Sequence, residues 1–295
     1  MPKKEADPVP TVQTVSGPSA RYWSTYQLAF LAVLAFALVA ATAGVVFSLL
    51  QSTPPAEGEI PASTLSLAPT APAQGESRIL GSLPAELGEG SGIAFSPSQN
   101  LIWVHNDDPG PAVLFAVDLD GRLRGSYELP GVAVMDFEDL DLAPCPSEEA
   151  ASCLYIGDTG DNERMRHEVR IVAVTEPVVG GRGPEVVGDV RFTYPDGTPR
   201  DIESLAVADG RILLVSKGQE GWSDVFEVRV DAMWQGGEIG APVTARHVAT
   251  LDLDTSDDQN RPTGAAVSPD GSTLGVRTAQ TMYRFSLEDL TAPPV

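Results

Sequence analysis

The chain has 295 residues, with 19 Lys and Arg against 41 Asp and Glu, which gives a formal net charge of −22. The part from residue 76 onward carries 16 of the basic and 37 of the acidic side chains, a net charge of −21. A surface this acidic repels nucleic acid and anionic lipid headgroups, so we expect no nucleic-acid partner.

A long apolar stretch near the N-terminus predicts a membrane-spanning helix. Residues 28–50 contain no charged side chain. In a helix they would extend about 35 Å, which is enough to cross a ~30 Å hydrocarbon core. We therefore expect a cytoplasmic tail over residues 1–26 and a transmembrane helix over residues 27–50.

The basic residues near this stretch lie on its N-terminal side. Lys3, Lys4 and Arg21 precede it, and the next basic residue is Arg78. Because positive charge favours the cytoplasmic side, we expect a single-pass protein of the cell membrane, with its N-terminus inside and the rest extracytoplasmic. A cleaved signal peptide, ending at the small residues 41–43, is the alternative, and it also exports the remainder.

The composition changes twice after the apolar stretch. Residues 51–77 are rich in Pro, Ala, Ser, Thr and Gly and poor in large apolar side chains, which predicts a semi-extended linker. Residues 78–295 form the expected folded domain and are numerous enough for a sizeable core.

The two cysteines of the chain, Cys145 and Cys153, are eight residues apart. In an oxidising compartment such a close pair favours a disulfide. The bond would close a small loop, so we expect it to stabilise the fold modestly.

The folded part repeats one strand pattern four times. Polar or small residues alternate with apolar ones, as in a β-strand that enters a core. These first strands are expected at residues 89–95, 136–142, 201–207 and 261–267. Second strands follow at residues 102–107, 154–159, 213–218 and 274–279, and third strands at residues 114–118, 170–174, 225–229 and 282–286. Fourth strands are visible at residues 123–129, 189–194 and 245–251.

The repeated unit of short strands predicts an all-β fold, a β-propeller with four visible blades. The fourth unit ends after its third strand. Residues 78–83, just before the first unit, are the candidate for its missing outer strand and for closure of a four-bladed ring. A five-bladed propeller truncated in its last blade is the alternative.

Several motifs in combination resemble a family of secreted or membrane-bound bacterial β-propellers. They are Ser91-Gly-Ile-Ala-Phe-Ser, Trp103-Val-His-Asn-Asp, Asp136-Phe-Glu-Asp-Leu, Tyr155-Ile-Gly-Asp-Thr-Gly-Asp-Asn, Tyr194-Pro-Asp-Gly, Asp201-Ile-Glu-Ser-Leu and Thr263-Gly-Ala-Ala-Val-Ser-Pro-Asp-Gly. The resemblance covers residues 86–285, and more distantly the chain is similar to calcium-dependent six-bladed lactonases and propeller phytases. Family members usually continue with another blade, so the resemblance implies the fold but neither a blade number nor a settled activity.

Propeller topology predicts where chemistry would lie. First strands begin, and second strands end, on the same face of the ring, which we call the top face. The carboxylates expected to converge there are Glu138, Glu203, Asp136, Asp201 and Asp158. Strict alternation places Asp136 and Glu138 on the strand face that they share with Leu140. Clustered carboxylates repel one another unless a cation joins them, and ligands with only oxygen donors suit Ca²⁺.

Two alternatives to a calcium site stay open. Lys217, Arg261 and Arg277 are candidates to pair with these acids and tie the blades together. The loop at residues 157–162 contains two Asp and one Asn, which suit a cation or a turn equally well. A second acidic segment, residues 252–260, is expected to be a solvated loop, with a weak surface calcium site as the alternative.

Two classes of function fit these predictions. The first is a binding or scaffold module that recognises a protein or glycan ligand on the top face. The alternative is a metal-dependent hydrolase of a lactone, ester or phosphoester, in which Ca²⁺ activates water. The candidate catalytic residues are then His105, as a general base, and Asp158. The sequence alone leaves open whether the protein is an enzyme.

Overall fold

The computed structural model describes residues 66–67, 79, 81–107, 110–218, 221–233 and 240–291. The chain divides into two units, residues 1–56 and 57–295, and all of these residues belong to the second. The predicted tail and transmembrane helix therefore lie outside the described residues, as does most of the linker. Within the described ranges, no helix is long and apolar enough to cross a membrane.

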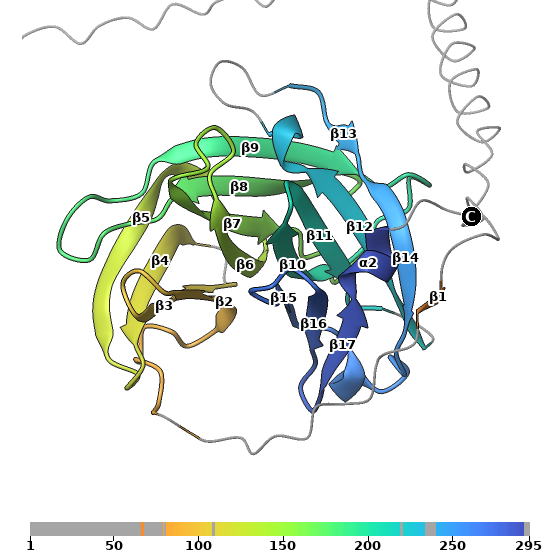
Figure 1. The fold of residues 1–295 in the computed structure, drawn as a ribbon, viewed down its shortest axis with the longest axis horizontal. Helices are drawn as coiled ribbons and strands as arrows, with labels where there is room; N and C mark the ends of the chain where they lie inside the picture. The colour runs from red at the N-terminus through yellow and green to blue at the C-terminus, as the bar shows by residue number, and fades with distance from the viewer. Residues whose placement is uncertain are drawn as a thin grey trace, which may run out of the picture. The chain divides into compact units, whose positions relative to one another are not determined.

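The described residues form four β-sheets arranged around a common centre (Figure 1). Blade one contains β2 (Gly90–Ser96), β3 (Leu101–Asn106), β4 (Pro111–Asp118) and β5 (Leu123–Ala133). Blade two contains β6 (Phe137–Pro144), β7 (Ser152–Asp158), β8 (Val169–Thr175) and β9 (Val186–Thr193). Blade three contains β10 (Ile202–Ala208), β11 (Arg211–Ser216), β12 (Trp222–Arg229) and β14 (Arg246–Asp252), and blade four contains β15 (Gly264–Val267), β16 (Thr273–Arg277) and β17 (Met282–Ser286).

Each blade is an antiparallel meander whose first strand is innermost. The inner strand β6 contacts both β2 and β10, and β10 contacts β15, so the four inner strands surround the centre (Figure 1). The remaining elements are short: β13 (Val243–Thr244), η1 (Val230–Ala232), η2 (Asp258–Asn260) and α2 (Leu287–Thr291). The predicted all-β, four-bladed propeller is confirmed, with each strand near its predicted position.

The predicted closure of the ring by residues 78–83 is wrong for the part of that segment that the structure describes. Blade four has three strands among the described residues, and residues 81–83 are not in a strand. The backbone at Gly81 lies instead against the turn at Asp120 in blade one. The absence of a side chain at Gly81 permits this close backbone approach. It places the segment against blade one, whereas the predicted closure needs it beside blade four.

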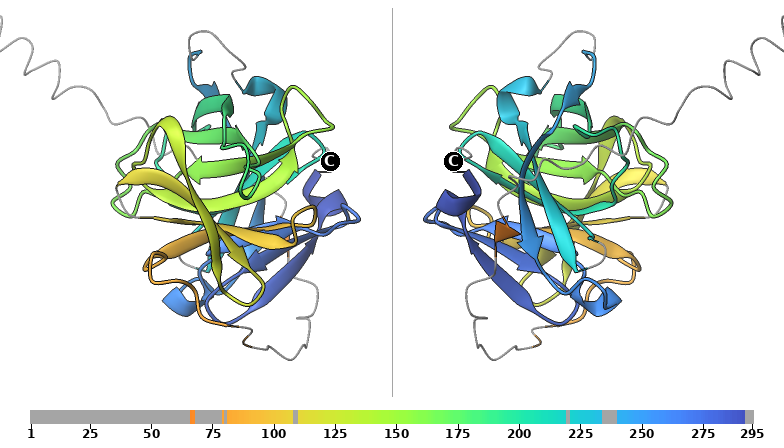
Figure 2. Two further views of the ribbon diagram at one scale, coloured as in Figure 1. Left: turned by 90° about the vertical axis from the view of Figure 1, so that its left-hand side faces the viewer. Right: turned by 90° about the vertical axis from the view of Figure 1, so that its right-hand side faces the viewer.

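One short part of the predicted linker is a strand. β1 (Ser66–Leu67) pairs in parallel with Thr250 and Leu251 of β14, at the outer edge of blade three. The right-hand view of Figure 2 shows β1 beside β14. The linker is therefore attached to the propeller at a point well before blade one begins.

Apolar side chains fill three of the interfaces between neighbouring blades, because blades two and three bury apolar residues on both of their faces. Blades one and two enclose a cluster that includes Trp103, Leu114, Leu140 and Ile156. Blades two and three enclose Tyr155, Phe192, Ile202, Leu214 and Phe226. Blades three and four enclose Leu213, Val225, Leu251, Leu274 and Phe285. These clusters fix the blades to one another and so fix the relative positions of the inner strands.

The predicted disulfide is confirmed. Cys145 and Cys153 are bonded to each other across the loop between β6 and β7, with their Cα atoms 4.8 Å apart. Both residues are buried and belong to the core between blades two and three.

Candidate functional site

An extra residue in three of the inner strands changes the direction of their polar side chains. In β2, β6 and β10 the pairing with the second strand shifts by one residue close to the start of the strand. Each bulge contains the third residue of the repeated pattern, which is Ser91, Glu138 or Glu203. A β-bulge re-aims side chains. The predicted placement of Glu138 on the face of Leu140 is therefore wrong, because alternation is interrupted between them.

Three carboxylates meet where β6 and β10 begin. Three carboxylate oxygens lie within 4.8 Å of one another, one each from Glu138, Asp201 and Glu203. Asp136 is nearby, since a side chain at Gly160 would collide with both Asp136 and Glu138. The structure therefore brings together four of the five predicted carboxylates, from two neighbouring blades. We call these four residues the carboxylate cluster.

Lys217 partly neutralises this cluster. Its ammonium group forms ion pairs with Glu203 and with Asp201, whose Oδ2 atom is 3.5 Å from Nζ. It also donates a hydrogen bond of 3.1 Å to Asn162 Oδ1. The predicted pairing of Lys217 with the acids is therefore present. One ammonium group nevertheless faces four carboxyl groups, so it cannot neutralise all of them when they are ionised together.

Glu138 is the least compensated member of the cluster. It is 6% exposed, and among the described residues its carboxylate forms no hydrogen bond and no ion pair. Burial raises its pKa to about 9, with further contributions from the charges of Glu203, Asp136 and Asp201. Burial also raises the pKa of Asp136 and of Glu203. The charge of Lys217 acts in the opposite direction but does not offset these effects at Glu138.

Asp158 does not join the cluster. Its carboxylate pairs with Arg166 at 2.9 Å and accepts a 3.1 Å hydrogen bond from the backbone N–H of Asp136. In the same loop, Asp161 accepts hydrogen bonds of 2.8 Å from the N–H groups of Met165 and Arg166. The loop at residues 157–162 therefore uses its acids to hold its own turn. Sequence analysis did not identify Arg166, because no repeat or spacing relates it to Asp158.

Two aspartates that the sequence analysis did not single out lie on β6 and connect neighbouring blades. Asp139 Oδ2 accepts hydrogen bonds from the N–H of Leu205 in β10, at 2.8 Å, and of Ala265 in β15, at 3.0 Å. Asp141 Oδ2 accepts one from the N–H of Val207 in β10, at 2.8 Å. Burial raises the pKa of Asp139 to about 8 and of Asp141 to about 6, although these N–H donors act in the opposite direction. The Asp-Leu-Asp-Leu alternation in this strand was the available signal.

The other predicted site residues are buried or held by contacts outside the carboxylate cluster. His105 is 1% exposed, and burial lowers its pKa to about 4, so the ring is neutral and out of contact with solvent. Arg261 pairs with Asp258 at 2.9 Å, and Arg277 donates a 3.1 Å hydrogen bond to the carbonyl of Thr263. The predicted ties between the cluster and Arg261 or Arg277 are wrong, because these guanidinium groups are held elsewhere.

The acidic segment at residues 252–260 forms local contacts. Asp257 accepts a 3.0 Å hydrogen bond from the N–H of Gln259 at the start of η2, and Asp258 pairs with Arg261. Asp254 accepts a hydrogen bond from Ser256. These are the contacts of an exposed acidic turn.

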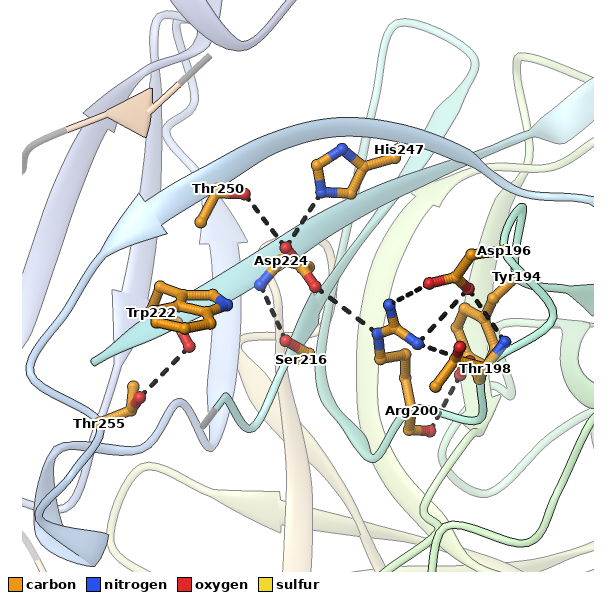
Figure 3. A network of polar contacts seen from close by, with 10 residues as sticks. All are labelled: Tyr194, Asp196, Thr198, Arg200, Ser216, Trp222, Asp224, His247, Thr250 and Thr255. Carbon is orange, nitrogen blue, oxygen red and sulfur yellow. Dashed lines mark hydrogen bonds and ion pairs between the residues drawn. The ribbon is translucent and has the colours of Figure 1, made fainter. Parts of the chain in front are cut away.

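A second polar network lies in blade three, centred on Asp224 of β12 (Figure 3). Asp224 Oδ1 is 3.0 Å from His247 Nε2 and accepts a 3.1 Å hydrogen bond from Thr250, and Oδ2 is 3.5 Å from Arg200 Nε. Arg200 also pairs with Asp196 at 2.7 Å. Burial opposes the charge of Asp224, but the contacts with His247 and Arg200 lower its pKa. The network is fully partnered and ties the loop before β10 to blade three.

Comparisons with known proteins add little to this description. No protein-family model and no curated protein matches the chain. Among solved structures, it is similar to the crystal structure of the Mitotic Checkpoint Complex, at 13% identity and a TM-score of 0.31, over 67% of this chain and 49% of that chain. It is also similar to the structure of putative TolB from Agrobacterium tumefaciens, at 12% identity and a TM-score of 0.36, over 68% of this chain and 59% of that chain. The chain thus matches between about half and three-fifths of the length of these structures, and the assignment of its fold rests on its strand order and register.

Proposed function

We propose that the protein is a binding module that takes a divalent cation, Ca²⁺, at the carboxylate cluster. The observation that carries the proposal is the convergence of Asp201 and Glu203 on Glu138, whose carboxylate has no hydrogen-bond or ion-pair partner among the described residues. Ca²⁺ binds oxygen ligands at about 2.3–2.6 Å, so two ligands of one ion lie at most about 5 Å apart. One oxygen from each of Glu138, Asp201 and Glu203 lies within 4.8 Å of the other two, which fits that limit.

Lys217 is the internal competitor for such an ion. Its Nζ atom already pairs with Glu203 and Asp201, and its side chain is 25% exposed, so it can move toward solvent. A bound divalent ion would also relieve the repulsion that raises the pKa of Glu138. We infer that the Glu203 carboxylate binds either the ion or the ammonium group of Lys217, but not both at once.

The location we propose is the outer side of a cell membrane, with the module held by residues 27–50. The support is the uncharged stretch and the basic residues that precede it. The Cys145–Cys153 disulfide suits an oxidising compartment outside the cytoplasm. A protein or glycan ligand would then bind on the top face, where the carboxylate cluster lies.

The alternative, a metal-dependent hydrolase of a lactone, ester or phosphoester, finds less support. A hydrolase needs a base that contacts the substrate or its water. His105 is buried and neutral, and Asp158 is 2% exposed and paired with Arg166. Neither side chain is placed to move a proton for a bound substrate, so we favour the binding module.

The test is a thermal melt of the purified full chain in a chelator and then in millimolar Ca²⁺. A ligand present at 100 times its dissociation constant adds about 2.7 kcal/mol to the free energy of unfolding, so Tm should rise by several degrees. Glu138→Gln should abolish the rise. Asp120→Asn, in an exposed turn, is the matched control and should retain it. An absent rise, or an equal rise in Glu138→Gln, would exclude the cluster as the calcium site.

A further inference from the structure

The interface between blade four and blade one differs from the other three. Instead of a filled apolar core, the described residues leave a cavity of about 340 Å³ there. β2 lines it on one side, and β15, β16 and β17 line it on the other. Figure 1 shows these two blades on either side of the open part of the ring.

The wall from blade four has a floor of small residues. Cross-strand pairing places Ala266, Gly275 and Arg284 side by side, and places Arg277 beside Met282 on the same sheet face. All five residues line the cavity. Because Ala266 and Gly275 have little or no side chain, they leave room above the middle of the sheet. The opposite face of the same strands is packed against blade three.

The wall from blade one is apolar. Ile93 of β2 lines the cavity and is 55% exposed, and Phe95, two residues further along the same strand, is 50% exposed. Residues two apart in a strand point to the same face. The residues that correspond to Ile93 in blades two and three, Leu140 and Leu205, are each 1% exposed, so this wall is unusually exposed apolar surface among the described residues.

Two polar groups in the lining of the cavity, Arg277 and Thr263, can donate hydrogen bonds to a ligand. Arg277 makes one hydrogen bond, to the carbonyl of Thr263, and no carboxylate lies within 4 Å of its guanidinium group among the described residues. The hydroxyl of Thr263 is buried without a partner in the same described set. Asp139 is the carboxylate in the lining, and its oxygens already accept backbone hydrogen bonds. The cavity is therefore a site for negative charge in an acidic domain.

We propose that this cavity binds a small amphipathic carboxylate. The apolar body of the ligand lies between Ile93 and the floor at Ala266 and Gly275. Its carboxylate accepts hydrogen bonds from Arg277, since a guanidinium group offers donors that match a carboxylate. The volume falls within the ~300–1,000 Å³ of pockets that bind small molecules. The site is separate from the carboxylate cluster, which takes the opposite charge.

The experiment uses the full chain in lipid nanodiscs and octanoate labelled with ¹³C at its carboxyl carbon. The carboxyl resonance should shift saturably with the protein and not with empty nanodiscs. Arg277→Gln should weaken binding about 10-fold or more, because it removes the charge-assisted hydrogen bonds. Octanamide, which has the same shape without the charge, should bind at least about 10-fold more weakly for the same reason. Arg124→Gln, at an exposed arginine of β5, should bind as the unaltered protein does.

Two further variants test the walls of the cavity. Ala266→Phe should fill it, and Met282→Glu should place a carboxylate beside Arg277; both should abolish binding. Ala266 and Met282 are exposed, so unchanged thermal melts should show that both variants fold. Unchanged affinity in Arg277→Gln or Met282→Glu, or no saturable shift above empty nanodiscs, would overturn the proposal. A concentration-dependent dimer that Ala266→Phe disrupts would overturn it too, because a second copy of the chain would then occupy the cavity.

Discussion

Two adjacent carboxylates in β6 show how strongly local partners decide the state of a buried acid. Burial raises the pKa of both Glu138 and Asp139. Asp139 has three backbone N–H donors, from Leu140, Leu205 and Ala265, which support its charge. Glu138 has three negative neighbours instead, against the single positive charge of Lys217. We therefore expect Asp139 to serve the fold and Glu138 to respond to protons and cations.

Glu138 should make the stability of the calcium-free protein depend on pH. Its pKa is about 9 in the folded protein against an ordinary value of 4.5 for a glutamate side chain, so the folded state holds more protons between these pH values. The free energy of unfolding must then fall as pH rises through this window. We expect Tm in a chelator to decrease from pH 5.5 to pH 8.5, and Glu138→Gln to reduce the decrease.

Thermal melts across this pH range, with both proteins in the same chelator, provide the measurement. The pKa values of Asp139 and Asp141 are also raised, to about 8 and about 6, so part of the slope should remain in Glu138→Gln. A slope of equal size in the two proteins would show that Glu138 does not titrate in this window.

At the scale of a single element, the bulge in β2 brings backbone close to the neighbouring blade. A Cβ atom at Gly92 would lie 2.5 Å from His105 Nε2 and 2.7 Å from the backbone nitrogen of Leu140 in β6. No side chain fits at that position without moving one strand. The bulge therefore needs glycine for the close approach of β2 and β6.

Gly92→Ala should lower the free energy of unfolding by about 1–3 kcal/mol, the usual effect of overpacking a core. Urea denaturation of the full chain measures the change. Gly88→Ala is the matched control, because a Cβ atom there would meet nothing within 4 Å. Equal stabilities of the two variants would mean that β2 and β6 can move apart at Gly92 without a loss in the free energy of unfolding.

The strands could be predicted from sequence because alternation and turn residues recur in each blade. Bulges could not, since an extra residue leaves no mark on composition and only the pairing of two strands reveals it. This explains why the carboxylate cluster was predicted from the repeat, while the direction of Glu138 was wrong. It also explains why Asp139, one residue further, was not identified as a link between blades.

At the scale of the whole molecule, Asp139 is a junction of three blades. It belongs to blade two and accepts hydrogen bonds from the inner strands of blades three and four. Blade four otherwise contacts the ring through blade three, because its other side faces the cavity. Among the described residues, the buried Asp139 therefore adds to the apolar face of blade four in holding its position.

Asp139→Ala should lower the free energy of unfolding by about 3–4 kcal/mol, because it leaves buried N–H groups in two blades without acceptors. Asp141→Ala removes one link between blades and should cost about half as much. Urea denaturation compares the two variants, with Asp120→Ala in the exposed turn as the control. A smaller loss in Asp139→Ala than in Asp141→Ala would contradict the role of Asp139 as a junction.

The pairing of β1 with β14 has a mechanical consequence for a chain held through residues 27–50. Tension from the anchor reaches the propeller first at two residue pairs, Ser66 with Thr250 and Leu67 with Leu251. When these pairs separate, residues 66–80 add at most about 50 Å of reach, at about 3.3–3.6 Å per residue. If residues 27–50 anchor the chain as proposed, the tether has two lengths, and the height of the domain above its support depends on the load that it bears.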